Sequence, residues 1–379
     1  VWVTQGWTFG YQHRFWDKES LQALFERVPN DKLIIVDLAN DYPKWVWKTE
    51  QTWKTHKRFY GKRWILSYVP NFGGKTLLTG DLNLYASCSA EALAHPDKGR
   101  LIGFGSAPEG LENNEVVYEL LADMGWQNQP IDLDHWLIEY CHSRYGSCPN
   151  AMQKAWKGLC RSVYSSLYSY PRFTWQTVIP DTLRKSKYDF NDTYFRAVED
   201  FLLCAPQLKD RPLYHSDALL FAAQYIGAKA DNLYRKALQA KAVGNRARAK
   251  QLVDKVIQLL LQADKLLASH PTDRLSRWVD AAKIAAATPQ ERMQYEMDAK
   301  RLITSWGGIQ QDYAARYWSG LIKTYYVPRI KLFFAGSKKK ELNNWEENWL
   351  KQPYNGDTEK SFNDPLATAR QLIQGLKSM

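Results

Sequence analysis

The chain has 379 residues, 45% of them hydrophobic and 24% charged, which is ordinary for a folded protein and long enough for two or three domains. No apolar stretch reaches the roughly 18 residues that a membrane-spanning helix needs, so we expect no membrane span. The formal net charge of +11 would suit a nucleic acid or another polyanion, but the lysines and arginines are mostly scattered, which argues against a basic nucleic-acid binder.

Four apolar runs near the start of the chain predict β-strands, and each ends in polar or aromatic side chains. They are residues 1–7, 32–38, 64–74 and 101–110. The stretches between them are long enough for helices, with amphipathic spacing at 18–27 and a second candidate at 81–95. This alternation of strands and helices predicts parallel strands in a βα architecture.

Polar and aromatic residues stand at the ends of these strands. Active sites of parallel barrels lie at the C-terminal ends of the strands. We therefore expect the side chains there to point into one mouth, and they are Trp7, Asp37, Asn71 and Glu109. Trp7 and Asn71 are candidates for substrate binding, and Glu109 is the candidate for catalysis.

After about residue 130 the strand signals stop and helical periodicity takes over. The predicted helices cover residues 134–144, 150–166, 192–203, 213–242, 246–269, 273–286, 289–303 and 314–334. Their apolar stripes are typical of a helical bundle, and neither a fixed-period repeat nor a low-complexity linker is evident. The expected fold is α/β followed by all-α, with a βα domain over 1–130 and an all-α domain over 131–379.

Glu109 carries the clearest chemical signal. It lies between Pro108 and Gly110, a tight irregular turn that would hold a carboxylate rigidly at a strand end. Glycoside hydrolysis generally needs two carboxylates, one protonated as the acid and one ionised as nucleophile or base, and Glu109 suits the second role. Asp37 is the candidate for the acid on strand-end geometry alone, although such an aspartate more often hydrogen-bonds neighbouring loops or a substrate hydroxyl.

Aromatic residues make up 14% of the chain and include 16 tryptophans. Planar rings of this kind stack on the faces of sugars or bases, so a ligand with such faces is one interpretation. Core packing is the commoner use of tryptophan, and many of these rings are expected to be buried.

Other catalytic and binding motifs are not favoured. The run 71–76 has the tail of a phosphate-binding loop, but Val69 occupies the place of its leading glycine. The sequence has no Gly-x-Ser-x-Gly elbow and no His-Glu-x-x-His helix. The five cysteines lack zinc-site spacing, so we expect neither a metal nor a cofactor. Cys141 and Cys148 flank a short turn and could form a disulfide, although separate thiols are the commoner outcome.

Four groups of residues, in order along nearly the whole chain, resemble a known family. They are Gln5-Gly6-Trp7, Asn71-Phe72-Gly73-Gly74, Ala107-Pro108-Glu109-Gly110 with the following Asn114-Glu115-Val116-Val117-Tyr118, and Trp306-Gly307 with Asp312-Tyr313. In this combination they are similar to the α-N-acetylglucosaminidases, glycoside hydrolase family 89.

The resemblance implies a (β/α)8 catalytic domain followed by an all-α domain, and a retaining exo-hydrolase of terminal, non-reducing α-linked N-acetylglucosamine. By that similarity Glu109 matches the nucleophile, while Trp306 and Tyr313, contributed by the helical domain, match positions that line the sugar pocket. It also implies an extracytoplasmic location, whether secreted, periplasmic or lysosomal.

The sequence departs from the family pattern in two places. In the family the acid/base glutamate follows an asparagine on a strand upstream of the Gln5-Gly6-Trp7 strand, where this chain begins. We therefore expect the second half of a (β/α)8 barrel packed on a helical bundle, without its general acid. A histidine that some members carry after the segment matching 161–164 has no clear counterpart.

These departures set what is expected of the isolated chain. The missing N-terminal half of the same protein is the expected partner, besides a glycan ending in N-acetylglucosamine. Alone, the chain is expected to be inactive and prone to aggregate, because four strands leave the edges of a sheet open. The alternative function is a non-catalytic carbohydrate-binding protein.

Overall fold

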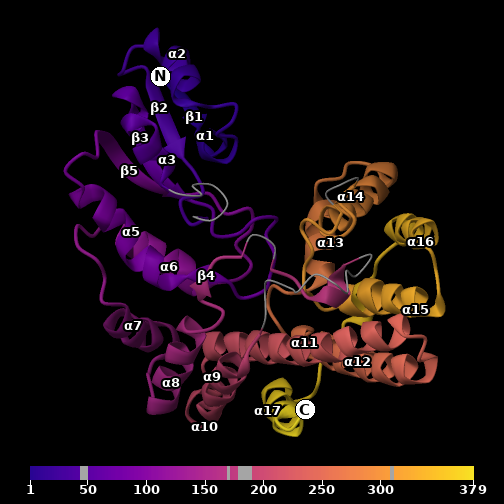
Figure 1. The fold of residues 1–379 in the computed structure, drawn as a ribbon. Helices are drawn as coiled ribbons and strands as arrows, with labels where there is room; N and C mark the ends of the chain where they lie inside the picture. The colour runs from indigo at the N-terminus through magenta and orange to yellow at the C-terminus, as the bar shows by residue number, and fades with distance from the viewer. Residues whose placement is uncertain (43–49, 169–170, 178–189, 308–310) are drawn as a thin grey trace. The chain divides into compact units, whose positions relative to one another are not determined.

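The computed structural model describes the chain except residues 43–49, 169–170, 178–189 and 308–310 (Figure 1). The chain divides into two compact units. The sheet unit comprises Val1–Gly74, Leu78–Ile138 and Val163–Ser169. The helical unit comprises Lys75–Leu77, Glu139–Ser162 and Tyr170–Met379. Each unit draws on separate stretches of the chain, and the boundary expected between residues 130 and 131 stays a prediction.

The sheet unit is built on four parallel strands in the order β1-β2-β3-β5 (Figure 1). They are β1 (Trp2–Gln5), β2 (Leu33–Asp37), β3 (Arg63–Tyr68) and β5 (Arg100–Ser106). In β2 the buried side chains alternate with half-buried ones, as expected for a strand with one covered face. The four strands predicted from the apolar runs are confirmed.

Helices connect the strands in the predicted alternation. They are α1 (Trp7–Tyr11), α2 (Lys18–Glu26), α3 (Thr52–Thr55), α4 (Lys57–Tyr60), α5 (Leu82–Ala94) and α6 (Glu115–Met124). Two of these helices, α2 and α5, begin at an aspartate whose side chain accepts a hydrogen bond from a backbone amide of the first turn. Asp17 Oδ1 accepts from Ser20 N at 2.7 Å, and Asp81 Oδ1 accepts from Leu84 N at 3.1 Å. Such caps satisfy N–H groups that the helix itself leaves unpaired.

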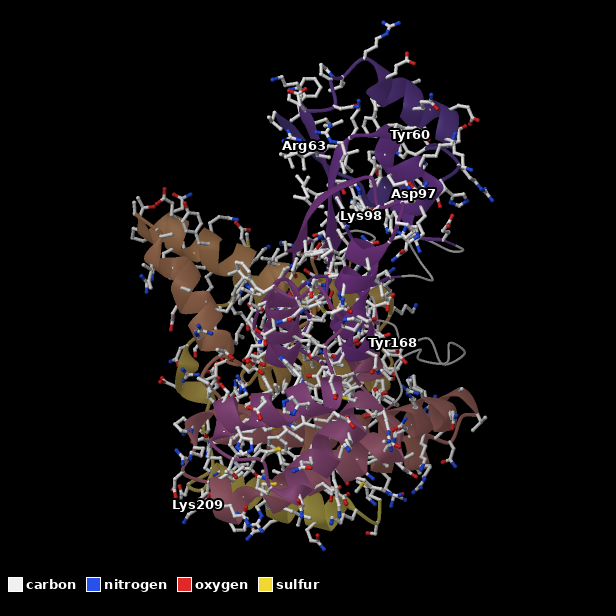
Figure 2. The ribbon with its side chains drawn as sticks, turned by 90° about the vertical axis from the view of Figure 1, so that its left-hand side faces the viewer. Tyr60, Arg63, Asp97, Lys98, Tyr168 and Lys209 are labelled. Carbon is white, nitrogen blue, oxygen red and sulfur yellow. The ribbon has the colours of Figure 1, made fainter. Side chains whose placement is uncertain are left out.

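Aromatic rings join the sheet to its helical cover. Trp53 of α3 stacks on Trp64 of β3 with ring centroids 5.2 Å apart, and both side chains are buried. Trp64 Nε1 donates to the Lys98 carbonyl at 3.0 Å, and Tyr60 OH donates to the Lys18 carbonyl at 2.8 Å (Figure 2 labels Tyr60 and Lys98). These tryptophans serve the core, which is the commoner use of the residue.

The helical unit is dominated by two long helices, α11 and α12, which run side by side (Figure 1). Gly244, with φ 75°, ends the first, and Asn245 Oδ1 caps the second by accepting from Arg248 N at 3.1 Å. From α7 onward the elements are α7 (Leu133–Tyr145), which starts in the sheet unit, α8 (Asn150–Cys160), η2 (Thr174–Gln176), α9 (Asp192–Leu203), α10 (Ala205–Leu208), α11 (Pro212–Ala242), α12 (Arg246–Leu267), α13 (Leu275–Ile284), α14 (Pro289–Leu302), η4 (Ile322–Tyr326), α15 (Val327–Ala335), α16 (Lys339–Lys351), η5 (Gly356–Thr358) and α17 (Pro365–Leu376).

The structure corrects three expectations about local structure. The helix expected over 150–166 ends at Cys160, and β6 (Ser165–Ser166) pairs antiparallel with β4 (Gly80–Asp81), so strands do not stop at residue 130. The helix expected over 314–334 starts late, because Gly320 has φ 79° and Asp264 Oδ1 caps the Gly320 amide at 2.9 Å. The helices α16 and α17 have no counterpart among the predicted ones.

Gly227, within α11, occupies a place where no side chain fits. A Cβ there would lie 2.7 Å from Phe173 Cε2 and 2.9 Å from the Tyr317 hydroxyl. Gly227→Ala is therefore expected to lower the free energy of unfolding by about 1–3 kcal/mol, although alanine favours the helix. Gly375→Ala, in α17 with nothing within 4 Å, should raise it by up to about 1 kcal/mol. Denaturant unfolding of both variants checks the pair, and a Gly227→Ala protein as stable as wild type would contradict it.

Candidate active site

Glu109 lies just beyond the C-terminal end of β5, beside the loop that follows β3. The pairing of the two strands continues past the sheet, since Ala107 N donates to the Tyr68 carbonyl at 2.9 Å. One step further, Glu109 N donates to the Asn71 carbonyl at 3.0 Å. The carboxylate itself is also held, because Gly73 N donates to Glu109 Oε2 at 2.6 Å. The residue remains solvent-exposed, so a ligand can reach a carboxylate whose position is fixed.

Two glycines shape the loop that holds this carboxylate. Gly73 and Gly74 have φ of 68° and 60°, the left-handed region that a side chain disfavours by roughly 1 kcal/mol or more. This turn aims the Gly73 amide at Glu109. The motif Asn71-Phe72-Gly73-Gly74 thus has a local physical role, which is to present a backbone donor to the strand-end glutamate.

Asparagines brace the same loops from behind. Asn71 Nδ2 donates to Asn113 Oδ1 at 3.0 Å, and both side chains are buried. Asn114, at φ 57°, accepts on its Oδ1 from Thr79 N at 3.1 Å. The hydroxyl of Tyr164 donates to the same oxygen at 3.0 Å. The segment from Glu109 to α6 is therefore tied to the loop after β3 by side-chain hydrogen bonds in the core.

Trp7 lies at the end of β1 and packs on a small apolar cluster made by Ala39, Tyr42 and Val69. Phe72 packs on the same cluster, its ring centroid 4.7 Å from that of Tyr42. Trp7 is half-buried and stacks on Tyr11 with centroids 5.2 Å apart. The cluster and the Asn71–Glu109 contact together bring the predicted residues Trp7, Asn71 and Glu109 to the same end of the sheet.

Asp37 does not join them, and the expectation that it points into the mouth is wrong. Asp37 lies on the same face of β2 as Leu33 and Ile35. Its partner in β3 is Leu66, which lies on the same face of β3 as Trp64, and this face packs against α3. The carboxyl is thus directed to the helix-covered core, where burial raises its pKa to about 7. The Asn40 side chain and the Trp53 amide counteract this rise only in part.

In the helical unit, Trp306 and Tyr313 form an aromatic pair with ring centroids 5.0 Å apart. Trp306 is 37% exposed and has φ 51°, while Tyr313 is half-buried. The ammonium of Lys75 lies 4.7 Å from the centre of the Tyr313 ring, close enough for a cation–π interaction. The two predicted pocket residues of the helical unit are therefore brought together.

The role of Lys75 and its neighbour was not predicted from the sequence. Lys75 is fully buried, Thr76 Oγ1 accepts from Tyr317 N at 2.8 Å, and the Thr76 carbonyl accepts from Gln224 Nε2 at 2.7 Å. The lysine and threonine of the phosphate-loop-like run are thus used inside the helical unit.

A serine, a histidine and an aspartate also meet in the helical unit. Ser216 Oγ lies 2.8 Å from His270 Nε2, and His270 Nδ1 lies 3.5 Å from an Asp273 carboxylate oxygen. However, Nδ1 accepts from the Asp273 amide at 3.1 Å, so the proton of the neutral ring is on Nε2 and is donated to Ser216. Burial lowers the pKa of His270 to about 4, which keeps the ring neutral. A serine nucleophile needs the opposite tautomer, so this cluster is structural.

The remaining predictions about the site concern thiols, metals and membranes. Cys141 and Cys148 are separate thiols, and burial raises the pKa of each. Within the described residues, no group of three or more His, Cys, Asp or Glu side chains is placed to hold a metal ion. In the same residues, no helix has the length and apolar character to cross a membrane.

Protein-family models match the chain over most of its length. The model of the alpha-N-acetylglucosaminidase (NAGLU) C-terminal domain matches residues 136–375, and that of the NAGLU TIM-barrel domain matches residues 1–128. The chain belongs to the alpha-N-acetylglucosaminidase family. The family resemblance and the fold class, α/β followed by all-α, are confirmed.

Individual relatives of this family are considerably longer than the chain. Human alpha-N-acetylglucosaminidase is 31% identical in an alignment 351 residues long, and the alignment covers 88% of this chain and 45% of the human protein. A family 89 glycoside hydrolase from Clostridium perfringens, in complex with 2-acetamido-1,2-dideoxynojirmycin, matches with a TM-score of 0.84 at 22% identity, over 99% of this chain and 44% of its own. The TM-score, identity and coverages are the same for a double variant of the Clostridium perfringens enzyme, with two glutamates changed to glutamine, in complex with its substrate GlcNAc-alpha-1,4-galactose. The chain spans less than half the length of these relatives.

Asp37 makes stability depend on pH in a defined window. An unfolded aspartate titrates near pH 3.9, whereas folded Asp37 has a pKa of about 7, so the unfolded chain loses this proton first. The free energy of unfolding should therefore fall between about pH 4 and pH 7, by up to about 1.4 kcal/mol per pH unit from this group. Asp37→Asn has no proton to lose and should reduce this dependence, while Asp41 and Asp264, whose pKa values burial also raises to about 7, keep their contributions.

Melting temperatures at pH 5 and pH 8 measure the effect of that substitution. Asp31→Asn is the matched control, because Asp31 is exposed and its pKa is lowered by its hydrogen bond with Lys32, outside this window. If Asp37→Asn and wild type lose the same number of degrees between the two pH values, the assignment is wrong.

Proposed function

We propose that the protein is a retaining exo-glycosidase that removes terminal, non-reducing α-linked N-acetylglucosamine from glycans, with Glu109 as its nucleophile. The observation that carries the proposal is the exposed Glu109 carboxylate at a strand end, held by the Gly73 amide in a chain of the alpha-N-acetylglucosaminidase family. The bacterial relative with GlcNAc-alpha-1,4-galactose supports the sugar and the linkage. An extracytoplasmic location belongs to the same proposal.

In this mechanism a carboxylate oxygen of Glu109 attacks the anomeric carbon of the sugar as the glycosidic bond breaks. The leaving oxygen takes a proton from a general acid, and a covalent glycosyl-enzyme remains. Water then attacks the same carbon, giving its proton to the deprotonated acid, and Glu109 leaves. Two inversions give net retention of the α-configuration. A rigidly held nucleophile lowers the entropy cost of the first step, and this is what the Gly73 contact would supply.

The general acid is proposed to come from strands beyond the four of this sheet. A closed parallel barrel has eight strands, and the TIM-barrel family model supports that closure here. Val3 in β1 is 65% exposed and Ile102 in β5 is 49% exposed, which fits edge strands that further strands would cover. Asp37 is unsuited to the acid role, because its carboxyl is turned to the helix-covered core.

Aromatic and amide side chains are proposed to bind the sugar. Trp7, half-buried at the end of β1, offers a ring for stacking, and Asn71 stands in the loop that holds Glu109. From the helical unit we assign Trp306 and Tyr313, because their rings contact each other and the sequence resemblance implies that these positions line the family's sugar pocket. Rings of this kind bind the apolar face of a sugar while their polar atoms stay available for hydrogen bonds.

Glu109→Gln tests the nucleophile. In the full-length protein it should lower turnover of an aryl α-N-acetylglucosaminide by at least about a thousandfold, since the charge is lost while the shape is kept. Glu119→Gln, an exposed glutamate on α6, is the control and should leave turnover unchanged. Near-normal activity of Glu109→Gln, or a first-formed β-anomer by NMR, would exclude the assignment. The wild-type protein could also bind the sugar without turning it over and without labelling of Glu109 by a fluorosugar. That result would favour a non-catalytic carbohydrate-binding protein.

Trp306→Ala tests the contribution of the helical unit. Loss of a stacking ring should weaken binding of 2-acetamido-1,2-dideoxynojirmycin by about tenfold, with little change in melting temperature. Trp126→Ala is the control, because Trp126 is 90% exposed in the sheet unit. Calorimetric titration and thermal melting give both numbers. Unchanged affinity together with a large fall in melting temperature would show that Trp306 is a packing residue.

A further inference from the structure

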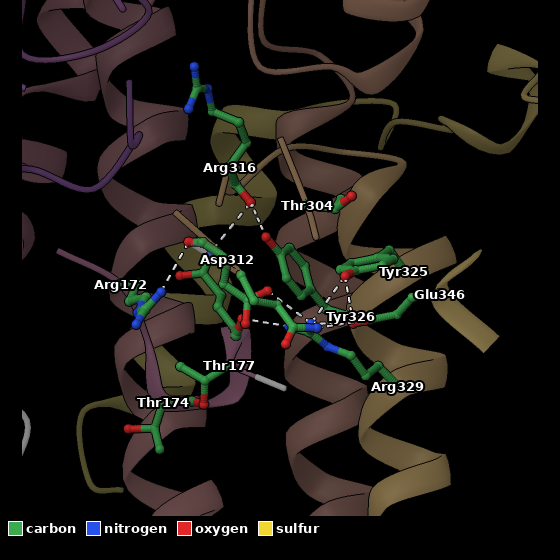
Figure 3. A network of polar contacts seen from close by, with 12 residues as sticks. Arg172, Thr174, Thr177, Thr304, Asp312, Arg316, Tyr325, Tyr326, Arg329 and Glu346 are labelled. Atoms are coloured by element: carbon green, nitrogen blue, oxygen red, sulfur yellow. Dashed lines mark hydrogen bonds and ion pairs between the residues drawn. The ribbon is translucent and has the colours of Figure 1, made fainter. Parts of the chain in front are cut away.

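A buried arginine stands at the centre of a polar network in the helical unit (Figure 3). Arg329, on α15, is 2% exposed. Its Nη1 donates to Asp312 Oδ1 at 3.0 Å and to Glu346 Oε1 at 2.8 Å. Its Nη2 donates to the Gln176 carbonyl at 2.5 Å. The guanidinium thereby joins four segments that are distant in sequence.

The network is attached at two consecutive positions to the segment that leads into Tyr313. The second oxygen of Glu346 accepts from Gln311 Nε2 at 2.8 Å, and Asp312 is bound by Arg329. Tyr325 OH donates to the first oxygen of Glu346, also at 2.8 Å. Two carboxylates around one guanidinium are thus supplied with further donors, which a buried group of charges requires.

Asp312 is fixed through its main chain as well. Its φ of 60° is in the left-handed region, which is disfavoured for a residue with a side chain. The Asp312 amide donates to the Thr304 carbonyl at 3.2 Å, and the Asp312 carbonyl accepts from Arg172 Nη1 at 3.0 Å. Side chain, amide and carbonyl are therefore all bound, so the network determines the direction in which the chain enters Tyr313.

The other ring of the pair is positioned from the same stretch of chain. Trp306 has φ 51°, and its amide donates to the Arg301 carbonyl at 2.9 Å. Its ring contacts Tyr313, and the Lys75 ammonium lies over the Tyr313 ring. A shift of Asp312 would therefore be passed to both rings through Tyr313.

We propose that Arg329 and Asp312 are positioning residues for the sugar site, acting on Trp306 and Tyr313 through the backbone of residue 312. The proposal rests on the proposed function and deepens it. Binding sites need side chains held to within about 0.5 Å by groups behind them. An always charged guanidinium that donates to two carboxylates is suited to this, because it cannot lose its proton and its planar shape fixes the direction of each donor.

The test compares variants of the full-length protein at one backbone position. Asp312→Ala removes the contact with Arg329 and leaves Glu346 to pair the buried charge. Asp312→Asn keeps an oxygen that can accept from Arg329 and tolerates φ 60°, so it is the conservative rescue. Glu347→Gln is the matched control, because this glutamate is the next residue of α16 and forms an exposed ion pair with Arg301 at 2.7 Å.

We expect Asp312→Ala to raise KM for the aryl glycoside by about tenfold, with a smaller change in kcat, because binding geometry is disturbed more than the chemistry of Glu109. Hydrogen exchange of the Asp312 amide should become faster in this variant and stay unchanged in Glu347→Gln. Asp312→Asn should restore most of both properties, and Glu347→Gln should match wild type. Gln311→Ala removes one donor to Glu346 but leaves the Arg329 guanidinium paired with both carboxylates, so it provides the same two readouts if Asp312→Ala does not fold.

The outcomes separate this proposal from the proposed function. Faster exchange at Asp312 with unchanged KM would overturn the positioning role, and so would unchanged exchange in Asp312→Ala. A wild-type protein that neither binds nor cleaves the sugar would overturn the proposed function, while the exchange data would still show whether Arg329 fixes this segment. A fall in kcat equal to the rise in KM, not rescued by asparagine, would assign a general structural role instead.

Discussion

Arg329 places a full positive charge among two carboxylates in a region that water barely reaches, where each of the three groups is at most 3% exposed. In such a medium an unpaired charge is far less stable than in water, so the arrangement is held as a whole rather than bond by bond. Helices α15 and α16 and the chain around Asp312 are joined by these contacts to the Gln176 carbonyl. The geometry of the Trp306–Tyr313 pair follows from that charge.

The sheet unit fixes its key residue by a different kind of bond. Glu109 is held by backbone amide and carbonyl groups of the loop after β3, and the loop is held by the left-handed glycines and by asparagine side chains. A backbone donor has no rotamers and carries no net charge that could change with pH. The carboxylate is thus located by parts of the chain that are themselves fixed by the strands.

Much of this arrangement could be predicted from local patterns. The strand that ends before Glu109 was visible because an apolar run meets Pro108 and Gly110, and the Glu109 motif is contiguous. The direction of the Asp37 side chain could not be predicted. Neighbouring residues of a strand face opposite sides, and a single sequence does not tell which face is covered. The late start of η4 was also hidden, because the cap on Gly320 comes from Asp264, 56 residues earlier. The partners of Arg329 lie up to 153 residues away, so no local pattern indicated them.

The short segment Lys75–Leu77 has a consequence for how the protein is made. It belongs to the helical unit, yet it is followed in the chain by residues of the sheet unit, and Thr76 receives its bond from Tyr317, 241 residues later. At translation rates of 5–20 residues per second, roughly 10–50 s pass between the emergence of the two partners. The helical unit therefore cannot be completed from the C-terminal part of the chain alone, because it includes a segment that is synthesised long before Tyr317.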